Sequence, residues 1–203
     1  MIAIVDYGMG NIHSVQKALQ LCGADTLVTN KPEDIRRCEK LVLPGVGAFD
    51  DAMQELTKQG LVPAIKGHIE AKKPFLGVCL GMQLLFEKSE EASRSSGLSL
   101  LEGSVVRFSA KYKIKVPHMG WNQIKKTSDK CLLLKDIKDG SFVYFCHSYY
   151  PDPKNREDAA ALCDYGLEFA AVVCRENIYG VQFHPEKSQA IGLKMLKNFV
   201  NLC

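Results

Sequence analysis

The sequence predicts an α/β fold, with a central, mostly parallel sheet flanked by helices and an additional antiparallel strand region. In the N-terminal half, short apolar runs alternate with segments whose apolar residues recur every three or four positions. This alternation is typical of a parallel sheet covered on both faces. After Ser89 the helical pattern fades and strand-like segments follow one another. Because 203 residues suit one core of ordinary size, we expect a single domain over residues 1–203.

The elements of the N-terminal half follow in a regular order. Each expected strand is a short apolar run, and these runs cover residues 1–5, 26–28, 41–43 and 74–78. Each expected helix carries apolar side chains at helical spacing, and these segments cover residues 12–22, 49–56, 61–71 and 80–87. Gly23 follows the first helix, and glycine is the residue that commonly ends one.

The second half is expected to consist mainly of strands. A polar loop follows Ser89, and the strand-like segments then cover residues 104–109, 114–124, 141–150, 159–163 and 170–183. The chain ends in an amphipathic pattern in which Ile191, Met195 and Phe199 share one face. Ser188 stands where a helix N-cap is expected, so we predict a terminal helix that begins after it.

Composition excludes several classes of protein. The 26 basic and 23 acidic side chains leave a net charge of +3, which does not call for a nucleic-acid partner. No C-x-x-C pair occurs among the eight cysteines, which argues against a zinc ribbon or a thioredoxin-like site, and we expect reduced thiols and no metal or cofactor. The apolar N-terminal run is too short for a signal peptide or a membrane span. We therefore expect a cytoplasmic protein.

Cys79 is the candidate nucleophile. It lies between Gly77 and Gly81, where a strand is expected to turn sharply into a helix. At such a turn the N–H groups and dipole of the helix N-terminus favour a thiolate and can hold an oxyanion. The alternative is a buried structural cysteine at the end of a strand.

His184 is the candidate base. The rigid Pro185 separates it from Glu186, and a carboxylate that accepts from one imidazole nitrogen leaves the other free to take a thiol proton. Alternatively, the His-x-Glu spacing forms half of a metal site or a surface turn. His147 is the chief rival as the base.

Glycine-rich turns and the single tryptophan point to two further features. The turn at residues 8–10 has His13 where a dinucleotide-binding pattern would have glycine, and the turn at residues 44–47 is not followed by the residues of a phosphate-binding loop. The second turn is better suited to presenting backbone N–H groups to a carbonyl oxygen. Trp121, in a segment that also bears methionine and glycine, indicates a partner surface.

The motifs at 74–83 and 182–186 resemble those of the class I glutamine amidotransferases, whose catalytic triad is Cys–His–Glu. Three further segments, at 4–11, 43–49 and 117–122, narrow the resemblance to the glutaminase subunits of imidazole glycerol phosphate synthase. The resemblance covers essentially the whole chain. It implies a fold of the amidotransferase type and hydrolysis of L-glutamine to glutamate and ammonia through a glutamyl thioester.

The same resemblance implies roles for individual residues. The catalytic residues would be Cys79, His184 and Glu186. The oxyanion would be held by backbone N–H groups of Leu80 and of the segment that contains Val46 and Gly47. The amino-acid end of glutamine would be bound by Gln83, Glu91, Ser148 and Tyr149, although Glu90 adjoins Glu91 and competes for its role. Residues facing a partner would be Trp121, Asn122, Tyr144 and Lys187.

The implied partner is the cyclase of the synthase, a (β/α)₈ barrel on a separate chain. It receives the ammonia within a heterodimer and makes imidazole glycerol phosphate and AICAR in histidine biosynthesis. Three alternatives remain open from the residues alone. The chain could be a paralogous subunit that feeds ammonia to an enzyme modifying a sugar nucleotide. It could be a cysteine hydrolase of peptides or small amides, or a catalytically silent regulatory subunit.

Overall fold

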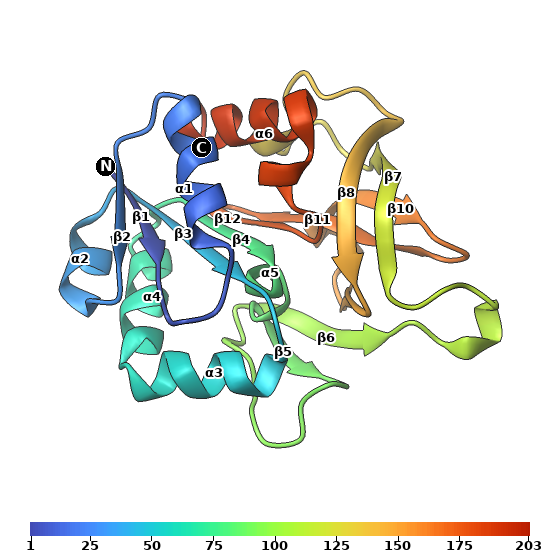
Figure 1. Cartoon of the computed structure of the whole chain (residues 1–203), viewed down its shortest axis with the longest axis horizontal. Helices are drawn as coiled ribbons and strands as arrows, with labels where there is room; N and C mark the ends of the chain where they lie inside the picture. The colour runs from blue at the N-terminus through green and yellow to red at the C-terminus, as the bar shows by residue number, and fades with distance from the viewer.

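A nine-stranded sheet runs through the computed structural model, which describes all 203 residues (Figure 1). Its parallel part consists, in spatial order, of β2 (Thr26–Thr29), β1 (Ile2–Val5), β3 (Lys40–Gly45), β4 (Phe75–Cys79) and β12 (Ile178–Val181). Antiparallel strands continue the same sheet as β11 (Glu168–Arg175), β10 (Ala159–Asp164), β7 (His118–Lys126) and β8 (Ser141–His147). The predicted α/β class is confirmed, and the antiparallel region extends the central sheet.

A small second sheet and four single-turn helices complete the fold. The sheet has three strands, β5 (Phe86–Ser89), β6 (Leu101–Arg107) and β9 (Tyr149–Pro153). The short 3₁₀ helices are η1 (Ala110–Tyr112), η2 (Leu132–Leu134), η3 (Arg156–Asp158) and η4 (Pro185–Lys187). No helix of the chain has both the length and the apolar character to cross a membrane.

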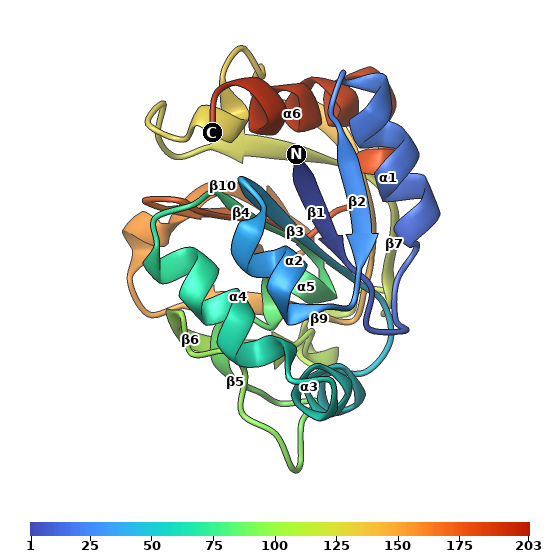
Figure 2. The same cartoon turned by 90° about the vertical axis from the view of Figure 1, so that its left-hand side faces the viewer.

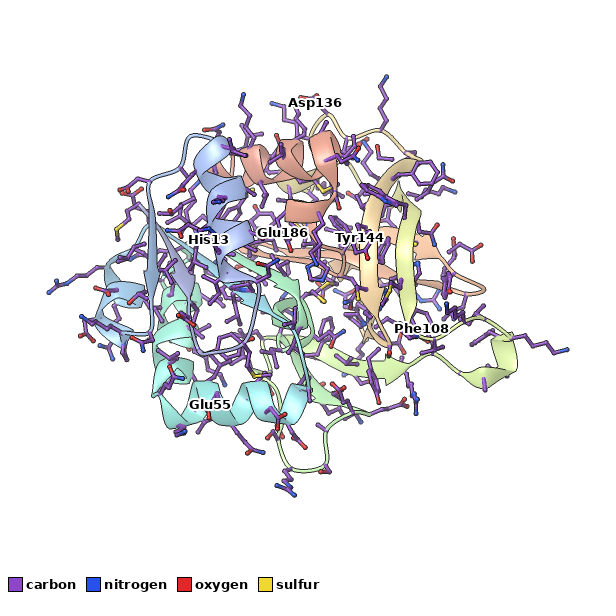
Figure 3. All side chains as sticks on the ribbon, viewed as in Figure 1. His13, Glu55, Phe108, Asp136, Tyr144 and Glu186 are labelled. Carbon is purple, nitrogen blue, oxygen red and sulfur yellow. The ribbon has the colours of Figure 1, made fainter.

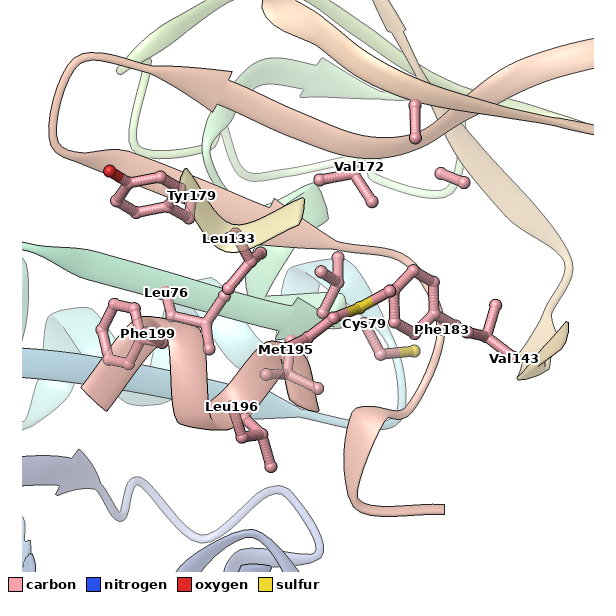
Figure 4. Packing of buried hydrophobic residues seen from close by; sticks show 14 of the residues in the cluster. Leu76, Cys79, Leu133, Val143, Val172, Tyr179, Phe183, Met195, Leu196 and Phe199 are labelled. Carbon is pink, nitrogen blue, oxygen red and sulfur yellow. The ribbon is translucent and has the colours of Figure 1, made fainter. Parts of the chain in front are cut away.

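Helices cover both faces of the parallel strands (Figure 2). One face carries α1 (Ile12–Leu21) and α6 (Gln189–Asn201); the other carries α2 (Pro32–Arg37), α3 (Phe49–Lys58) and α4 (Leu61–Glu70). Alternation along β1 accounts for the two cores, because Ile2 and Ile4 point to the first and Ala3 and Val5 to the second. In the first core, Met195, Leu196 and Phe199 of α6 pack with Leu76 of β4 (Figure 4).

The helix expected over residues 80–87 is wrong in its second half. The helix α5 covers only Leu80–Gln83, and the chain then enters strand β5. The carbonyl oxygens of Leu84 and Leu85 accept hydrogen bonds from the backbone N–H groups of Leu98 and Leu100. These long-range bonds replace the next turn of helix, and both leucines are completely buried in the second core.

Other boundaries differ in smaller ways. The segment expected as one strand over 170–183 is the hairpin β11–β12, which turns at Glu176 with a positive φ of 52°. The segment 141–150 divides at Ser148 into β8 and β9, which belong to different sheets. The short helix α2 lies in a stretch for which the sequence pattern predicted no element.

Three adjacent parallel strands end at the same edge of the sheet. In the register of β3 and β4, Gly45 lies opposite Cys79, and in the register of β12 and β4, Val181 lies opposite Val78. The residues that follow these strand ends are therefore neighbours in space, and this edge of an open α/β sheet is where ligands commonly bind.

Candidate active site

Cys79 occupies the sharp turn between β4 and α5. Its backbone has a positive φ of 55°, a conformation that residues with side chains rarely adopt. The turn needs a glycine on each side of the cysteine. A Cβ at Gly77 would lie 2.5 Å from the carbonyl oxygen of Gly81, and a Cβ at Gly81 would overlap the carbonyl oxygen of Leu43. The two glycines thus allow Cys79, the candidate nucleophile, to sit on the tight, strained turn predicted from their spacing.

His184 and Glu186 follow β12 and form a buried pair. The Nδ1 atom of His184 lies 2.8 Å from Oε1 of Glu186, and the two side chains are 5% and 1% exposed. Burial opposes the charge on His184, but hydrogen bonds and opposite charges at Cys79 and Glu186 outweigh it and raise the pKa of His184 to about 10. The surroundings of the imidazole, with Cys79 on one side and Glu186 on the other, therefore favour its protonated form.

Two residues outside this triad hold the His184 loop. The His184 N–H donates to the carbonyl oxygen of Tyr144 at 2.9 Å, and Tyr144 N–H donates to the hydroxyl of Ser188 at 2.9 Å. The Ser188 hydroxyl in turn donates to the carbonyl oxygen of His184 at 2.7 Å. Ser188 precedes α6 as predicted, but its hydroxyl makes no helix cap and fixes the histidine loop instead. Figure 3 labels Tyr144 on β8 and Glu186 beneath α6.

His147 has no free ring nitrogen. Its Nδ1 lies 2.8 Å from the carbonyl oxygen of Tyr149, and its Nε2 lies 3.0 Å from Nδ1 of His118. Burial lowers the pKa of His147 to about 3, with smaller contributions from His118 and His184. The geometry therefore favours His184 over His147 as the candidate base.

A cleft of about 350 Å³ opens over Cys79, a volume at the small end for ligand sites. It is lined by Val46, Gly47, Cys79, Leu80, Gln83, Glu91, Pro117, Cys146, His147, Ser148, Tyr149, His184 and Lys187. The residues predicted for the oxyanion and for glutamine thus all lie around one cleft with Cys79 and His184. Pro117 and Cys146 also line it, and nothing in their sequence context predicted this. The structure contains no group of three or more residues arranged to hold a metal ion.

The two adjacent glutamates are separated by the fold. Glu91 lines the cleft, and its Oε2 accepts a 2.9 Å hydrogen bond from the backbone N–H of Phe49. Glu90 instead accepts a 2.8 Å bond from the backbone N–H of Arg107 on β6 and does not line the cleft. The geometry therefore places only Glu91 where it can meet a ligand.

Gln182 connects Cys79 with Gln83, the residue predicted to bind glutamine. Gln182 is fully buried, its Nε2 lies 3.8 Å from Sγ of Cys79, and its Oε1 accepts a 3.1 Å hydrogen bond from Gln83. Gln83 also donates to the carbonyl oxygen of Tyr149 at 2.9 Å. The sequence did not single out Gln182, although a polar residue inside an apolar strand run is a signal that could have identified it.

The expected oxyanion donors lie beside Cys79. Leu80 is the first residue of α5, and residues 46 and 47 directly follow Gly45, the register partner of Cys79. Gly47 has a φ of +102°, so glycine is required for this backbone conformation.

The sequence matches a known protein family. The profile of the family described as "Glutamine amidotransferase class-I" matches residues 3–202. The chain belongs to this family. Two curated relatives of this amidotransferase are named "Imidazole glycerol phosphate synthase subunit HisH". The one from Caldanaerobacter subterraneus subsp. tengcongensis is 50% identical, covering 98% of this chain and 97% of the relative. The one from Bacillus cereus (strain ATCC 10987) is 53% identical, covering 98% and 93%.

Solved structures agree with the fold of this amidotransferase. A putative GMP synthase subunit from Thermoplasma acidophilum superposes with a TM-score of 0.73 at 21% identity, covering 98% of this chain and 91% of that one. PurLQS from Thermotoga maritima gives a TM-score of 0.74 at 16% identity, covering 98% and 96%. These structures confirm the fold, and the family match over residues 3–202 confirms the glutamine amidotransferase class predicted from the sequence.

The predicted partner-facing residues of this amidotransferase separate onto two faces of the β7–β8 pair. Trp121 lies opposite Tyr144 in the register, and their rings meet edge to face at 6.0 Å. The Lys187 Nζ lies 5.9 Å from the centre of the Tyr144 ring. Asn122 points the other way, because its side chain donates to the carbonyl oxygen of Asp164 at 2.9 Å. Trp121, Tyr144 and Lys187 are thus brought together, and Asn122 is not brought to them.

Proposed function

We propose that this chain is the glutaminase subunit of an imidazole glycerol phosphate synthase, which hydrolyses L-glutamine and passes the ammonia to a cyclase subunit. The observation that carries the proposal is the convergence of Cys79 with the His184–Glu186 pair at the carboxyl ends of β4 and β12. Curated relatives about half identical over nearly the full chain support the choice of acceptor over the sugar-nucleotide alternative.

The arrangement suits acyl transfer through a thioester. The Cys79 thiolate forms a bond to the carboxamide carbon of glutamine, and the electron pair of the C=O bond moves onto the oxygen. Backbone N–H groups of Leu80 and of the 46–47 segment stabilise that oxyanion. As the C–N bond breaks, His184 gives its proton to the departing nitrogen, and ammonia and a glutamyl thioester result.

Hydrolysis of the thioester reverses the proton transfer. The now neutral His184 takes a proton from water, whose oxygen attacks the thioester carbon. The C–S bond breaks, glutamate leaves, and the thiolate–imidazolium pair is restored. Glu186 stabilises the imidazolium and holds its Nδ1, so that the other nitrogen faces the sulfur in both half-reactions.

Four residues of the cleft are suited to the amino-acid end of glutamine. The carboxylate of Glu91 can bind the α-ammonium group, and Gln83, Ser148 and Tyr149 offer hydrogen-bonding groups around it. In a small cleft with one carboxylate, a free amino acid is a better ligand than an extended peptide, which disfavours the peptidase alternative.

The partner is proposed to dock on the face that carries Trp121, Tyr144 and Lys187. Trp121 is 46% exposed, and its neighbours Met119 and Phe142 are also large exposed apolar side chains. Lys187 lines the cleft as well, so ammonia would be released close to this face. We propose a heterodimer with a (β/α)₈ cyclase in the cytoplasm, where the eight free thiols would stay reduced.

Reconstitution tests the proposal. The purified chain is mixed with the cyclase subunit of the same organism, glutamine and the phosphoribosyl-formimino acceptor, and glutamate and imidazole glycerol phosphate are measured. We expect both products with the wild type and neither from glutamine with Cys79→Ala, while added ammonium salt restores imidazole glycerol phosphate to the variant complex. Glutamine turnover that responds only to a different barrel protein would contradict the choice of acceptor.

Covalent trapping identifies the nucleophile. A glutamine analogue that carries an electrophile should label Cys79 and leave Cys146, the other thiol of the cleft, unmodified. Cys146→Ala is the matched control and should be labelled like the wild type. Labelling at Cys146 that persists in Cys79→Ala would overturn the assignment.

A further inference from the structure

A chain of hydrogen bonds crosses the β7–β8 pair beneath the cleft. The Asn122 side chain donates to the carbonyl oxygen of Asp164, and its Nδ2 also lies 3.3 Å from Nε2 of His118. The Nδ1 atom of His118 lies 3.0 Å from Nε2 of His147. Nδ1 of His147 then lies 2.8 Å from the carbonyl oxygen of Tyr149. His118 and His147 are direct register partners on β7 and β8.

Only one placement of protons satisfies all of these contacts. A carbonyl oxygen only accepts, so Nδ1 of His147 must carry a proton and Nε2 must be its acceptor. His118 must therefore donate from Nδ1 and accept at Nε2, and Asn122 must present its amide nitrogen there. The Asn122 oxygen is occupied on its other side, because it accepts a 2.8 Å bond from the backbone N–H of Gln123. Both histidines are thus neutral and of the same tautomer.

Their surroundings favour the neutral state. His118 is 3% exposed and His147 is 6% exposed. The His118 ring stacks between Phe145 at 4.6 Å and Tyr165 at 3.9 Å. Neither histidine has a carboxylate partner, and burial lowers the pKa of His118 to about 4. A second positive charge beside His184 is thereby avoided.

This series of hydrogen bonds, from Asn122 to Tyr149, ends at the wall of the glutamine cleft. The Tyr149 carbonyl that accepts from His147 also accepts from Gln83, which continues through Gln182 to Sγ of Cys79. His147, Tyr149 and Gln83 all line the cleft. The mechanism described above uses neither His118 nor Asn122.

We propose that His118 and Asn122 are positioning residues for glutamine. They hold His147 in its Nδ1-protonated form, which fixes the Tyr149 carbonyl and, through it, Gln83. The inference rests on the proposed function, because it takes Gln83 and Tyr149 as parts of the glutamine site. It also assigns Asn122 to the positioning of His118 within the subunit, in place of the partner contact implied by the family resemblance.

Kinetics of the reconstituted complex test this role. Asn122→Asp is isosteric but cannot donate to His118, so the KM for glutamine should rise about tenfold with a smaller change in kcat. Its affinity for the cyclase and its ammonia-dependent product formation should match the wild type. Asn201→Asp makes the same change at the exposed C-terminal end of α6, away from the cleft and the proposed docking face, and as the control it should change none of these. Weakened cyclase binding with an unchanged KM in Asn122→Asp would overturn the inference.

Nitrogen NMR of the histidine rings tests it without any substrate. In the wild-type chain, His118 and His147 should both show the neutral Nδ1–H tautomer and should not titrate between pH 5 and 8. In Asn122→Asp the carboxylate should draw a proton onto Nε2 of His118. An Nε2–H tautomer of His147 in the wild type would refute the chain of bonds, whereas absent glutaminase activity with intact tautomers would refute only the proposed function.

Discussion

The hydroxyl of Ser188 donates a 2.7 Å hydrogen bond to the carbonyl oxygen of His184 and is almost completely buried. Ser188→Ala removes this bond and leaves the N–H of Tyr144 without its acceptor. We expect kcat for glutamine to fall by about tenfold and the unfolding free energy to fall by about 1–3 kcal/mol. Steady-state kinetics and urea titration measure the two effects.

Ser141→Ala is the matched control, since the Ser141 hydroxyl donates a similar 2.6 Å bond to the carbonyl oxygen of Lys138 at an exposed turn. It should leave kcat unchanged. Equal losses of kcat in the two variants would show that Ser188 has no special role at His184.

The glycine after the nucleophile should be irreplaceable. Gly81→Ala would push its Cβ into the carbonyl oxygen of Leu43, so we expect a loss of more than about 3 kcal/mol of stability, or failure to fold. Gly67→Ala is the opposite case, because it lies in α4 with no atom within 4 Å of the added Cβ. It should raise stability by about 0.5–1 kcal/mol. Thermal melts of both variants would reveal any reversal of this order.

Removing the charge of Glu186 should change the pH range of catalysis. Glu186→Gln deprives the imidazolium of its buried carboxylate partner, so the pKa of His184 falls from about 10. We expect kcat to drop by at least about tenfold, because a hydrogen bond to a charged group contributes about 1.5–3 kcal/mol. The alkaline limb of the rate profile should move to lower pH. A profile that keeps its wild-type alkaline limb would contradict the assignment.

The buried histidine pair should make the protein sensitive to acid. Folding holds the pKa of His118 at about 4 and that of His147 at about 3, whereas an unfolded histidine has its ordinary value of about 6.5. Below that value only the unfolded state takes up the protons, so stability is full above it and is lost as pH falls towards 4. The slope reaches roughly 1.4 kcal/mol per pH unit for each histidine.

His118→Phe checks the origin of that slope. One titrating group disappears, so the fall of unfolding free energy between pH 6 and pH 5 should become less steep. The variant also loses the hydrogen bond to His147, which lowers stability at every pH and leaves the slope as the diagnostic quantity. An unchanged slope would mean that His118 does not stay neutral in the folded state.

The aromatic pair on β7 and β8 should anchor the cyclase. Trp121→Ala removes an exposed ring that contacts Tyr144, and a buried interface tryptophan typically contributes 2 kcal/mol or more, or about thirtyfold in affinity. Leu132→Ala, another exposed apolar side chain, lies outside that face and should leave the affinity unchanged. Titration calorimetry with the cyclase distinguishes the two variants, and equal affinities would place the interface elsewhere.

Local sequence signals predicted the alternating strands and helices, and they pointed to Cys79 and to the His184–Glu186 pair, which the fold brings to one edge of the sheet. They failed where distant contacts decide the outcome. Leu84 and Leu85 fit a helical pattern, yet their carbonyls bond to residues 98 and 100, and the helix stops. The six-residue helix α2 is too short to display a helical period.

The parts of the site that the sequence did not predict depend on how strands pair in the folded structure. His118 and His147 are 29 residues apart, and only the pairing of β7 with β8 brings them together. In the sequence, Gln182 is a single polar residue in an apolar run. Only the pairing of β12 with β4 brings it to Cys79. Ser188 has the residue type and position of a helix cap, and only the tertiary structure directs its hydroxyl to His184.

The backbone of Tyr144 bonds to both His184 and Ser188, while its ring forms part of the proposed docking face. An alanine scan of that face would delete the ring and leave both backbone bonds in place, so it would report docking and miss any transmission to the active site. Amide-to-ester replacement at His184, or hydrogen exchange of its N–H, would measure the transmission directly. Any coupling of this kind runs through the main chain of Tyr144, so replacement of the Tyr144 side chain cannot detect it.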